Sequence, residues 1–334
     1  MFLNNAWEKK GVLVTGAGGF IGSHLVECLV EAGARVRAFV RYTSSGSIGC
    51  LSDCGGETLA EVEIFRGDLA NPEAVARSVS GCDVVLNLGA LIPIPYSYVH
   101  LREYAAANVE GAIDILEACR RAEVTRIVQI SSSEVYGTAQ TTPIDEQHPL
   151  QAQSPYAATK IGADQLALSY WRSFGLPVVV ARPFNTFGPR QSARAVIPTI
   201  IAQALARDVV EIGSTSPLRD FLFVRDTASG IMACGSAPKA VEGEVINLGT
   251  GAEISIAEVI ERVFGIVGRN LPVLAADERV RPGPSEVERL LADASKAHRL
   301  LGWRHETPFD DGLRATVDWM RSAIDADGAS VYTV

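Results

Sequence analysis

A tyrosine and a lysine four residues apart form a reactive pair in this sequence. Tyr156 and Lys160 have the spacing Tyr-x-x-x-Lys, which places both side chains on one face of a helix. A lysine ammonium near a phenol lowers the pKa of the phenol, so the spacing predicts a tyrosinate base that works near neutral pH.

Two further polar residues follow an apolar run that ends at Ile130. Ser132 can donate or accept a hydrogen bond at a hydroxyl that is being oxidised, although a polar strand end is the plain alternative. Glu134 can exchange a proton with an acidic carbon. An anionic side chain at the carboxyl end of a sheet strand lies in the crevice where ligands bind, so we predict a catalytic role for Glu134.

A glycine-rich turn near the N-terminus predicts a dinucleotide site. The turn follows an apolar run, 12–15, and precedes a helical period, 24–31. Glycine lets the backbone approach a pyrophosphate, and a helix N-terminus supplies amide donors and the positive end of a dipole. The expected cofactor contacts in this turn are Gly16, Gly19, Phe20, Ile21 and Gly22.

Residues after the second and third expected strands bear on the choice of cofactor. NAD-specific folds usually carry an acidic residue at the end of the second strand, but Arg41 stands there. Arg41 could meet a 2′-phosphate, so NADP remains an alternative to NAD, and a solvated loop arginine is equally compatible. Asp68, which precedes Leu69, could accept a hydrogen bond from adenine or cap the next helix.

Strands and helices alternate through the first half of the chain. Strands are expected over 12–15, 35–40, 63–65, 84–88 and 126–130, with helices over 24–31, 72–79 and 104–122. This order predicts an α/β fold with a doubly wound parallel Rossmann sheet.

Beyond a strand over 178–181 the alternation loosens, which predicts a smaller C-terminal α/β substrate-binding region. Helices are expected there over 197–206, 256–267 and 309–323. We assign 1–185 to a dinucleotide-binding domain with a returning segment near 225–250, and 186–224 with 251–330 to the substrate-binding region.

Composition and charge exclude several classes of protein. The chain has 334 residues, 47% hydrophobic and 21% charged, which is ordinary for a folded globular protein. A net charge of −9 argues against a nucleic-acid or membrane surface, so an anionic ligand needs a local positive site. Six scattered cysteines and a start without a leader pattern predict a cytoplasmic protein with free thiols and no metal site.

Together these motifs resemble the extended short-chain dehydrogenase/reductases that act on nucleotide sugars. The resemblance covers nearly the whole chain and includes Asn108-Val109-Glu110-Gly111, Arg182-Pro183-Phe184-Asn185, Arg219-Asp220-Phe221 and Asn247-Leu248-Gly249. Ser132-Ser133-Glu134 is similar to the Thr-Ser-Glu form of the 4,6-dehydratases, a form that UDP-glucuronate decarboxylases share. The 4-epimerases usually carry a small residue at the position of Glu134.

Four other stretches resemble the legionaminic-acid type of dehydratase, which acts on nucleotide-linked N-acetylglucosamine. They are residues 91–98, 153–156, 188–198 and 281–289. The resemblance implies oxidation at C4, loss of water across C5 and C6, and return of the hydride to C6. UDP-N-acetylglucosamine is therefore the expected substrate, with 5,6-dehydration, 4-epimerisation and UDP-glucuronate decarboxylation as alternatives.

The resemblance also implies a role for each site residue. The implied catalytic residues are Ser132, Ser133, Glu134, Tyr156 and Lys160. Tyr156, Lys160 and Asn108 are also expected at the cofactor, and Asn185, Arg219 and Arg281 at the substrate diphosphate. Arg190 and Arg194 are interpreted as surface or interface residues. A homodimer is expected through the helices near 104–122 and 154–172.

Overall fold

A seven-stranded parallel sheet forms the centre of the protein. The computed structural model describes residues 4–276 and 282–327, with side chains over 6–276 and 282–323. The strand order is β11-β6-β5-β4-β1-β2-β3, and every neighbouring pair is parallel. The strands are β1 (Gly11–Thr15), β2 (Arg35–Arg41), β3 (Val62–Gly67), β4 (Val84–Asn87), β5 (Arg126–Ile130), β6 (Val178–Pro183) and β11 (Val245–Leu248). The doubly wound Rossmann sheet is confirmed.

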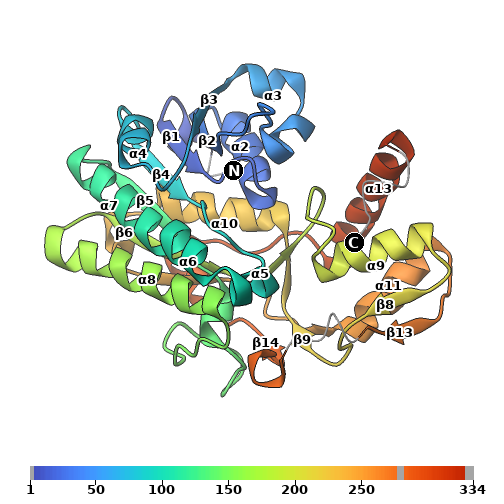
Figure 1. Ribbon diagram of the computed structural model, residues 1–334. Helices are drawn as coiled ribbons and strands as arrows, with labels where there is room; N and C mark the ends of the chain where they lie inside the picture. Colours follow the sequence, from blue (N-terminus) through green and yellow to red (C-terminus); the bar gives the residue numbers. More distant parts are fainter. Residues whose placement is uncertain (1–3, 277–281, 328–334) are drawn as a thin grey trace.

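Helices cover both faces of this sheet (Figure 1). One layer holds α2 (Phe20–Glu31) and α10 (Val224–Ser236), and the other holds α4 (Pro72–Val79), α7 (Gly111–Arg121) and α8 (Pro155–Phe174). Alternating residues of β1 pack against the two helix layers. Val12 and Val14 contact the first layer, and Leu13 contacts the second. Burial on both faces explains why these strands are continuous apolar runs.

The helix expected over 104–122 is interrupted. It consists of α6 (Leu101–Tyr104), a π-helical turn η2 (Ala105–Glu110) and α7. A short helix that the sequence pattern did not indicate, α5 (Ile94–Val99), precedes it. The interruption matters for the site because Asn108 lies within the π-helical turn.

Small sheets and three helices form the second region of the molecule. The sheets are β7 (Asn185–Phe187) with β10 (Phe221–Phe223), β8 (Val210–Ile212) with β13 (Val273–Ala275), and β9 (Leu218–Arg219) between β12 (Ile254–Ser255) and β14 (Arg289–Leu290). The helices α9 (Val196–Ala206), α11 (Ile256–Val267) and α13 (Phe309–Asp327) share one apolar core, and their positions confirm the expected ones.

Short elements complete the described chain. They are α1 (Asn4–Trp7), η1 (Gly49–Asp53), α3 (Gly56–Ala60), η3 (Ser133–Tyr136), η4 (Lys239–Val241), η6 (Gly283–Ser285) and α12 (Ser295–Leu301). Among the described residues, no helix combines the length and the apolar character needed to cross a bilayer.

Candidate active site

The glycine-rich turn connects β1 to α2 and is closed by its own backbone. The Gly19 amide donates to the Gly16 carbonyl at 2.9 Å, and Gly16 has a positive φ of 66°. A Cβ on Gly22 would lie 2.3 Å from the Gly16 oxygen, so only glycine fits there. Gly19 is the N-cap of α2 and has no side chain that could cap the helix. The amides of Phe20 and Ile21 therefore begin the helix without a capping side chain. This cradle fits a pyrophosphate.

The residues expected around the adenosine lie at the ends of β2 and β3. Arg41 is the last residue of β2 and is exposed. Asp68 follows β3 and accepts a hydrogen bond from the Ala70 amide at 3.0 Å, whereas Asn71 caps α4. The helix-cap alternative for Asp68 is therefore wrong. Leu69 is half-buried beside Gly89, on which a Cβ would clash with it.

The structure brings the reactive residues of β5 and α8 together. Ser132 follows β5, accepts a hydrogen bond from the Glu134 amide at 3.2 Å and hydrogen-bonds the Tyr156 side chain. Helix α8 begins directly before Tyr156, because Ser154 caps it and Pro155 occupies its first position. Ser133 is buried and Glu134 half-buried next to this pair.

Burial dominates the protonation of Tyr156 and Lys160. Burial raises the pKa of Tyr156, and the hydrogen bond with Ser132 opposes that change. Burial lowers the pKa of Lys160 to about 8, and its Nζ donates to the Ile130 carbonyl at 2.5 Å. The expectation that Lys160 lowers the pKa of Tyr156 is not met in this structure, because the ammonium is held by a strand-end carbonyl and desolvation outweighs other influences.

Asn108 joins the π-helical turn to two other parts of the site. Its Oδ1 accepts from the Leu91 amide at 2.8 Å, and its Nδ2 donates to the Leu91 carbonyl at 3.0 Å and to Thr159 Oγ1 at 3.0 Å. Thr159 is the neighbour of Lys160 in α8. Asn108 therefore links the residue before Lys160 to the loop that follows β4.

Residues expected at the substrate lie on the small strands of the second region. Asn185 begins β7, and its Oδ1 is a buried oxygen without a hydrogen-bond partner among the described residues. Arg219 in β9 is buried and forms an ion pair with Glu286 at 3.4 Å. Arg281 lies outside the described residues.

Three segments far apart in the sequence meet beside the start of α8. The Tyr98 hydroxyl and Ser285 Oγ are 2.6 Å apart, and Ser285 Oγ donates to the Gln153 carbonyl at 2.5 Å. The Gln153 side chain in turn donates to the carbonyls of Pro284 and Glu286, each at 3.0 Å. Each residue belongs to a stretch that carried the resemblance, but no sequence signal indicated that the stretches touch.

Arg190 is not the solvated surface residue that the sequence analysis allowed. Its side chain is 10% exposed and its two terminal nitrogens each donate to the Glu27 carboxylate at 2.8 Å. Glu27 lies in α2, so the segment after β7 is fastened to the helix that begins at the glycine-rich turn. Arg190 has a positive φ of 67°, an uncommon conformation for a residue with a side chain.

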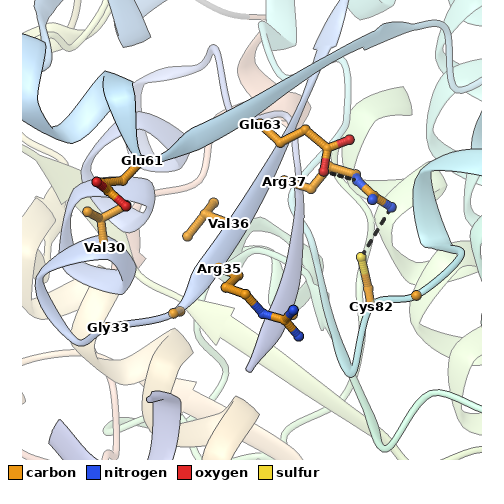
Figure 2. A pocket seen from close by; sticks show the side chains of 11 residues that line it. Val30, Gly33, Arg35, Val36, Arg37, Glu61, Glu63 and Cys82 are labelled. Carbon is orange, nitrogen blue, oxygen red and sulfur yellow. Dashed lines mark hydrogen bonds and ion pairs between the residues drawn. The ribbon is translucent and has the colours of Figure 1, made fainter. Parts of the chain in front are cut away.

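A hollow of about 460 Å³ lies at the opposite edge of the sheet (Figure 2). It is lined by the start of β1 at Gly11 and by the loop after α2 at Gly33. Figure 2 shows Arg37 there with Glu63, to which it donates at 2.8 Å, and with Cys82. Ligands of open α/β sheets bind at the carboxyl ends of the strands, so this hollow is separate from the candidate site.

Comparison with known proteins agrees with the geometry. The family model described as GDP-mannose 4,6 dehydratase matches residues 13–316. The low-salt glycan biosynthesis protein Agl12 of Haloferax volcanii is 33% identical over 92% of this chain and 97% of its own length. A dTDP-glucose 4,6-dehydratase of Actinoplanes sp. is 31% identical over 93% of this chain and 98% of its own length.

Solved structures of a 4,6-dehydratase and of a 4-epimerase both have the fold of this chain. DesIV, a dTDP-glucose 4,6-dehydratase of Streptomyces venezuelae with NAD bound, has a TM-score of 0.85 at 28% identity over 94% of this chain and 98% of its own. A UDP-N-acetylglucosamine 4-epimerase of Methanobrevibacter ruminantium has a TM-score of 0.85 at 29% identity over 95% and 99%. These findings confirm the resemblance to extended short-chain dehydrogenase/reductases, the expectation of a lyase-class enzyme and its link to NAD. The chain belongs to the nucleotide-sugar 4,6-dehydratase family.

Proposed function

We propose that the protein is an NAD-dependent 4,6-dehydratase that acts on UDP-N-acetylglucosamine. The observation that carries the proposal is the joining of Ser132 to Tyr156 beside Lys160, with Glu134 on the same strand end. An epimerase needs the first three groups, but a carboxyl group at position 134 supplies the additional acid and base that dehydration requires.

The proposed roles follow the order of the reaction. Tyr156 takes the proton of the C4 hydroxyl, and Ser132 hydrogen-bonds the same oxygen. The hydrogen bond from Ser132 to Tyr156 favours this transfer, because it lowers the pKa of the phenol against the effect of burial. NAD held at the glycine-rich turn and by Lys160 would supply reversible hydride transfer between C4 and C6. Glu134 removes the C5 proton, which the C4 ketone has made acidic, and water leaves C6 with a proton from Glu134 or through Ser133. A proton is then added at C5, so the net change is the loss of one water.

The proposed binding residues divide between the two ligands. Gly16, Gly19, Phe20, Ile21 and Gly22 would hold the cofactor pyrophosphate, Asp68 and Leu69 would contact the adenine, and Lys160 would hold the nicotinamide ribose. Asn185 and Arg219, with Arg281, bind the substrate diphosphate. Arg41 is exposed at the end of β2, and a 2′-phosphate, which distinguishes NADP from NAD, is the group that it would bind.

The proposal is tested by incubation of the protein with NAD and UDP-N-acetylglucosamine in deuterated water. NMR and mass spectrometry are expected to show loss of water and deuterium at C5. A product of unchanged mass with inverted C4 would instead establish 4-epimerisation, and a 5,6-ene would establish 5,6-dehydration. dTDP-glucose is assayed in parallel, because relatives of this chain are named for that substrate.

The variant Glu134→Gln separates dehydration from C4 oxidation. We expect reduced cofactor to form while C5 deuterium exchange stops, because the amide cannot accept the C5 proton. Ser133→Ala is the matched variant for the relay and is expected to slow water loss while exchange at C5 continues. Wild-type exchange in Glu134→Gln would contradict the proposed role.

We further propose a homodimer and a reducing, cytoplasmic location. Helices α7 and α8 lie side by side at the outer edge of the molecule (Figure 1), where Leu166 and Trp171 are half-buried and Phe174 is exposed. All six cysteines are free thiols, as expected in a reducing compartment. Light scattering after size exclusion tests the dimer, and a monomeric mass would contradict it.

A further inference from the structure

A buried carboxylate, that of Asp164, lies behind Tyr156 and Lys160 and hydrogen-bonds residues in or next to the neighbouring strands. Asp164 lies in α8, one helical turn beyond Lys160, and is fully buried. Its Oδ2 accepts from Ser131 Oγ at 2.7 Å and from the Nε and Nη2 atoms of Arg182 at 3.1 and 2.9 Å. Ser131 immediately precedes Ser132, so Asp164 joins the end of β5 to α8.

The same carboxylate begins a buried chain of hydrogen bonds. Arg182, in β6, also donates through Nη1 to the Tyr136 hydroxyl at 3.0 Å, and that hydroxyl donates to Asn247 Oδ1 at 2.7 Å. The backbone N–H of Asn247 donates to Glu146 Oε1 at 2.8 Å. Burial raises the pKa of Asp164, and the Arg182 guanidinium and the Ser131 hydrogen bond oppose that rise. Arg182 is 2% exposed and always charged, so it is the counter-ion that favours the ionised form of Asp164.

The second oxygen of Asp164 has no hydrogen-bond partner among the described residues. Its charge raises the pKa of Lys160, against the larger effect of burial. The titratable groups nearby are Tyr156 on α8 and, around that phenol, Glu134 after β5 and Tyr104 on α6. Asp164 is thus a buried negative charge whose influence reaches Lys160.

We propose that Asp164 is a positioning residue that holds the end of β5 against α8 and places a carboxylate one helical turn from Lys160. This inference rests on the proposed function only for the expected effect on kcat and on its pH dependence. In the absence of Asp164, Ser132 would lose its fixed place opposite Tyr156, and Lys160 would release its proton at a lower pH.

Lysine NMR tests the electrostatic role without any substrate. The chain has five lysines, so protein labelled with ¹³C at lysine Cε gives few signals, and Lys160→Arg identifies that of Lys160. We expect a midpoint near pH 8 in the wild type and a shift to lower pH by about one unit in Asp164→Asn. An unchanged midpoint would overturn the electrostatic role.

Matched variants distinguish positioning from general stability. Asp226 is another buried carboxylate, which accepts from the amides of Glu306 and Thr307 at 3.0 Å each, away from α8. Asp226→Asn is expected to lower the unfolding midpoint but leave the lysine signal unchanged. Ser131→Ala removes one bond and no charge, so it is expected to lower kcat with the Lys160 midpoint unchanged.

Turnover then tests the geometric role. In Asp164→Asn we expect kcat to fall about tenfold or more, and the alkaline limb of kcat/KM to move to lower pH, because the protonated lysine is lost earlier. Wild-type kcat and pH profile in this variant would overturn the proposal. If the wild type is inactive on every nucleotide sugar, the proposed function fails, whereas the NMR shift still decides the link between Asp164 and Lys160.

Discussion

The sheet region and the second region of this molecule position their site residues in different ways. In the sheet region the reactive groups follow the ends of β1 and β5 or begin α8, so a motif of a few residues carries each of them. In the second region Arg219 lies on a strand of two residues, paired with strands that begin at Ile254 and Arg289. The proposed catalytic groups are thus encoded locally, whereas the proposed substrate contact at Arg219 depends on contacts between distant segments.

This difference predicts distinct kinetic effects. A change in a local motif of the sheet region removes a reacting group or a cofactor contact, so it lowers kcat or cofactor affinity. A change in the second region weakens a contact with the part of the substrate that does not react, so it raises KM. Four substitutions probe this division, and they are given in order of decreasing effect.

Tyr156→Phe is expected to lower kcat by about 10³-fold and to leave cofactor binding unchanged, because the phenol oxygen is the proposed base. Steady-state kinetics and NADH fluorescence measure the two quantities. Tyr170→Phe is the control on the same helix, where the lost hydroxyl donates to Glu117. Turnover by Tyr156→Phe near the wild-type rate would remove Tyr156 as the base.

Gly22→Ala is expected to weaken cofactor binding by roughly a hundredfold, or about 3 kcal/mol, because its Cβ would clash with the Gly16 carbonyl. Titration calorimetry with NAD measures the loss. Gly56→Ala is the control, since a Cβ there meets no atom within 4 Å. Wild-type affinity in Gly22→Ala would show that the turn does not hold the cofactor.

Arg219→Gln is expected to raise KM for the nucleotide sugar about tenfold, with kcat nearly unchanged, since a charged hydrogen bond to the diphosphate is lost. Arg262→Gln, which breaks an exposed pair with Asp310 in the same region, is the control. If kcat falls and KM does not change, the proposed division between the two regions is wrong.

Gly265→Ala is expected to stabilise the second region by about 0.5–1 kcal/mol without affecting either kinetic constant. Gly265 lies within α11, and a Cβ there would meet no atom within 4 Å. Urea denaturation measures the gain. A loss of stability would mean that α11 is packed more tightly at this position than the structure indicates.

Features that depend on neighbours along the chain could be predicted from the amino-acid sequence. Strand-forming runs buried on both faces, the helix start at Ser154, and the Tyr156 and Lys160 spacing follow from local rules. The helix expected over 24–31 begins earlier, at Phe20, because Gly19 caps it without a side chain. These rules predicted the Rossmann sheet and which side chains converge at the ends of β1 and β5, whereas the family came from a resemblance carried by the motifs.

The residues that support the reactive groups could not be predicted in this way, because tertiary contacts bring them together. Asp164, with Ser131 and Arg182, and the meeting of Tyr98 with Ser285 join residues that are far apart in the chain. The π-helical turn at Asn108 likewise depends on partners in two other segments. The pKa values of Tyr156 and Lys160 are dominated by burial, which no spacing encodes, because desolvation is a property of everything that packs around a group.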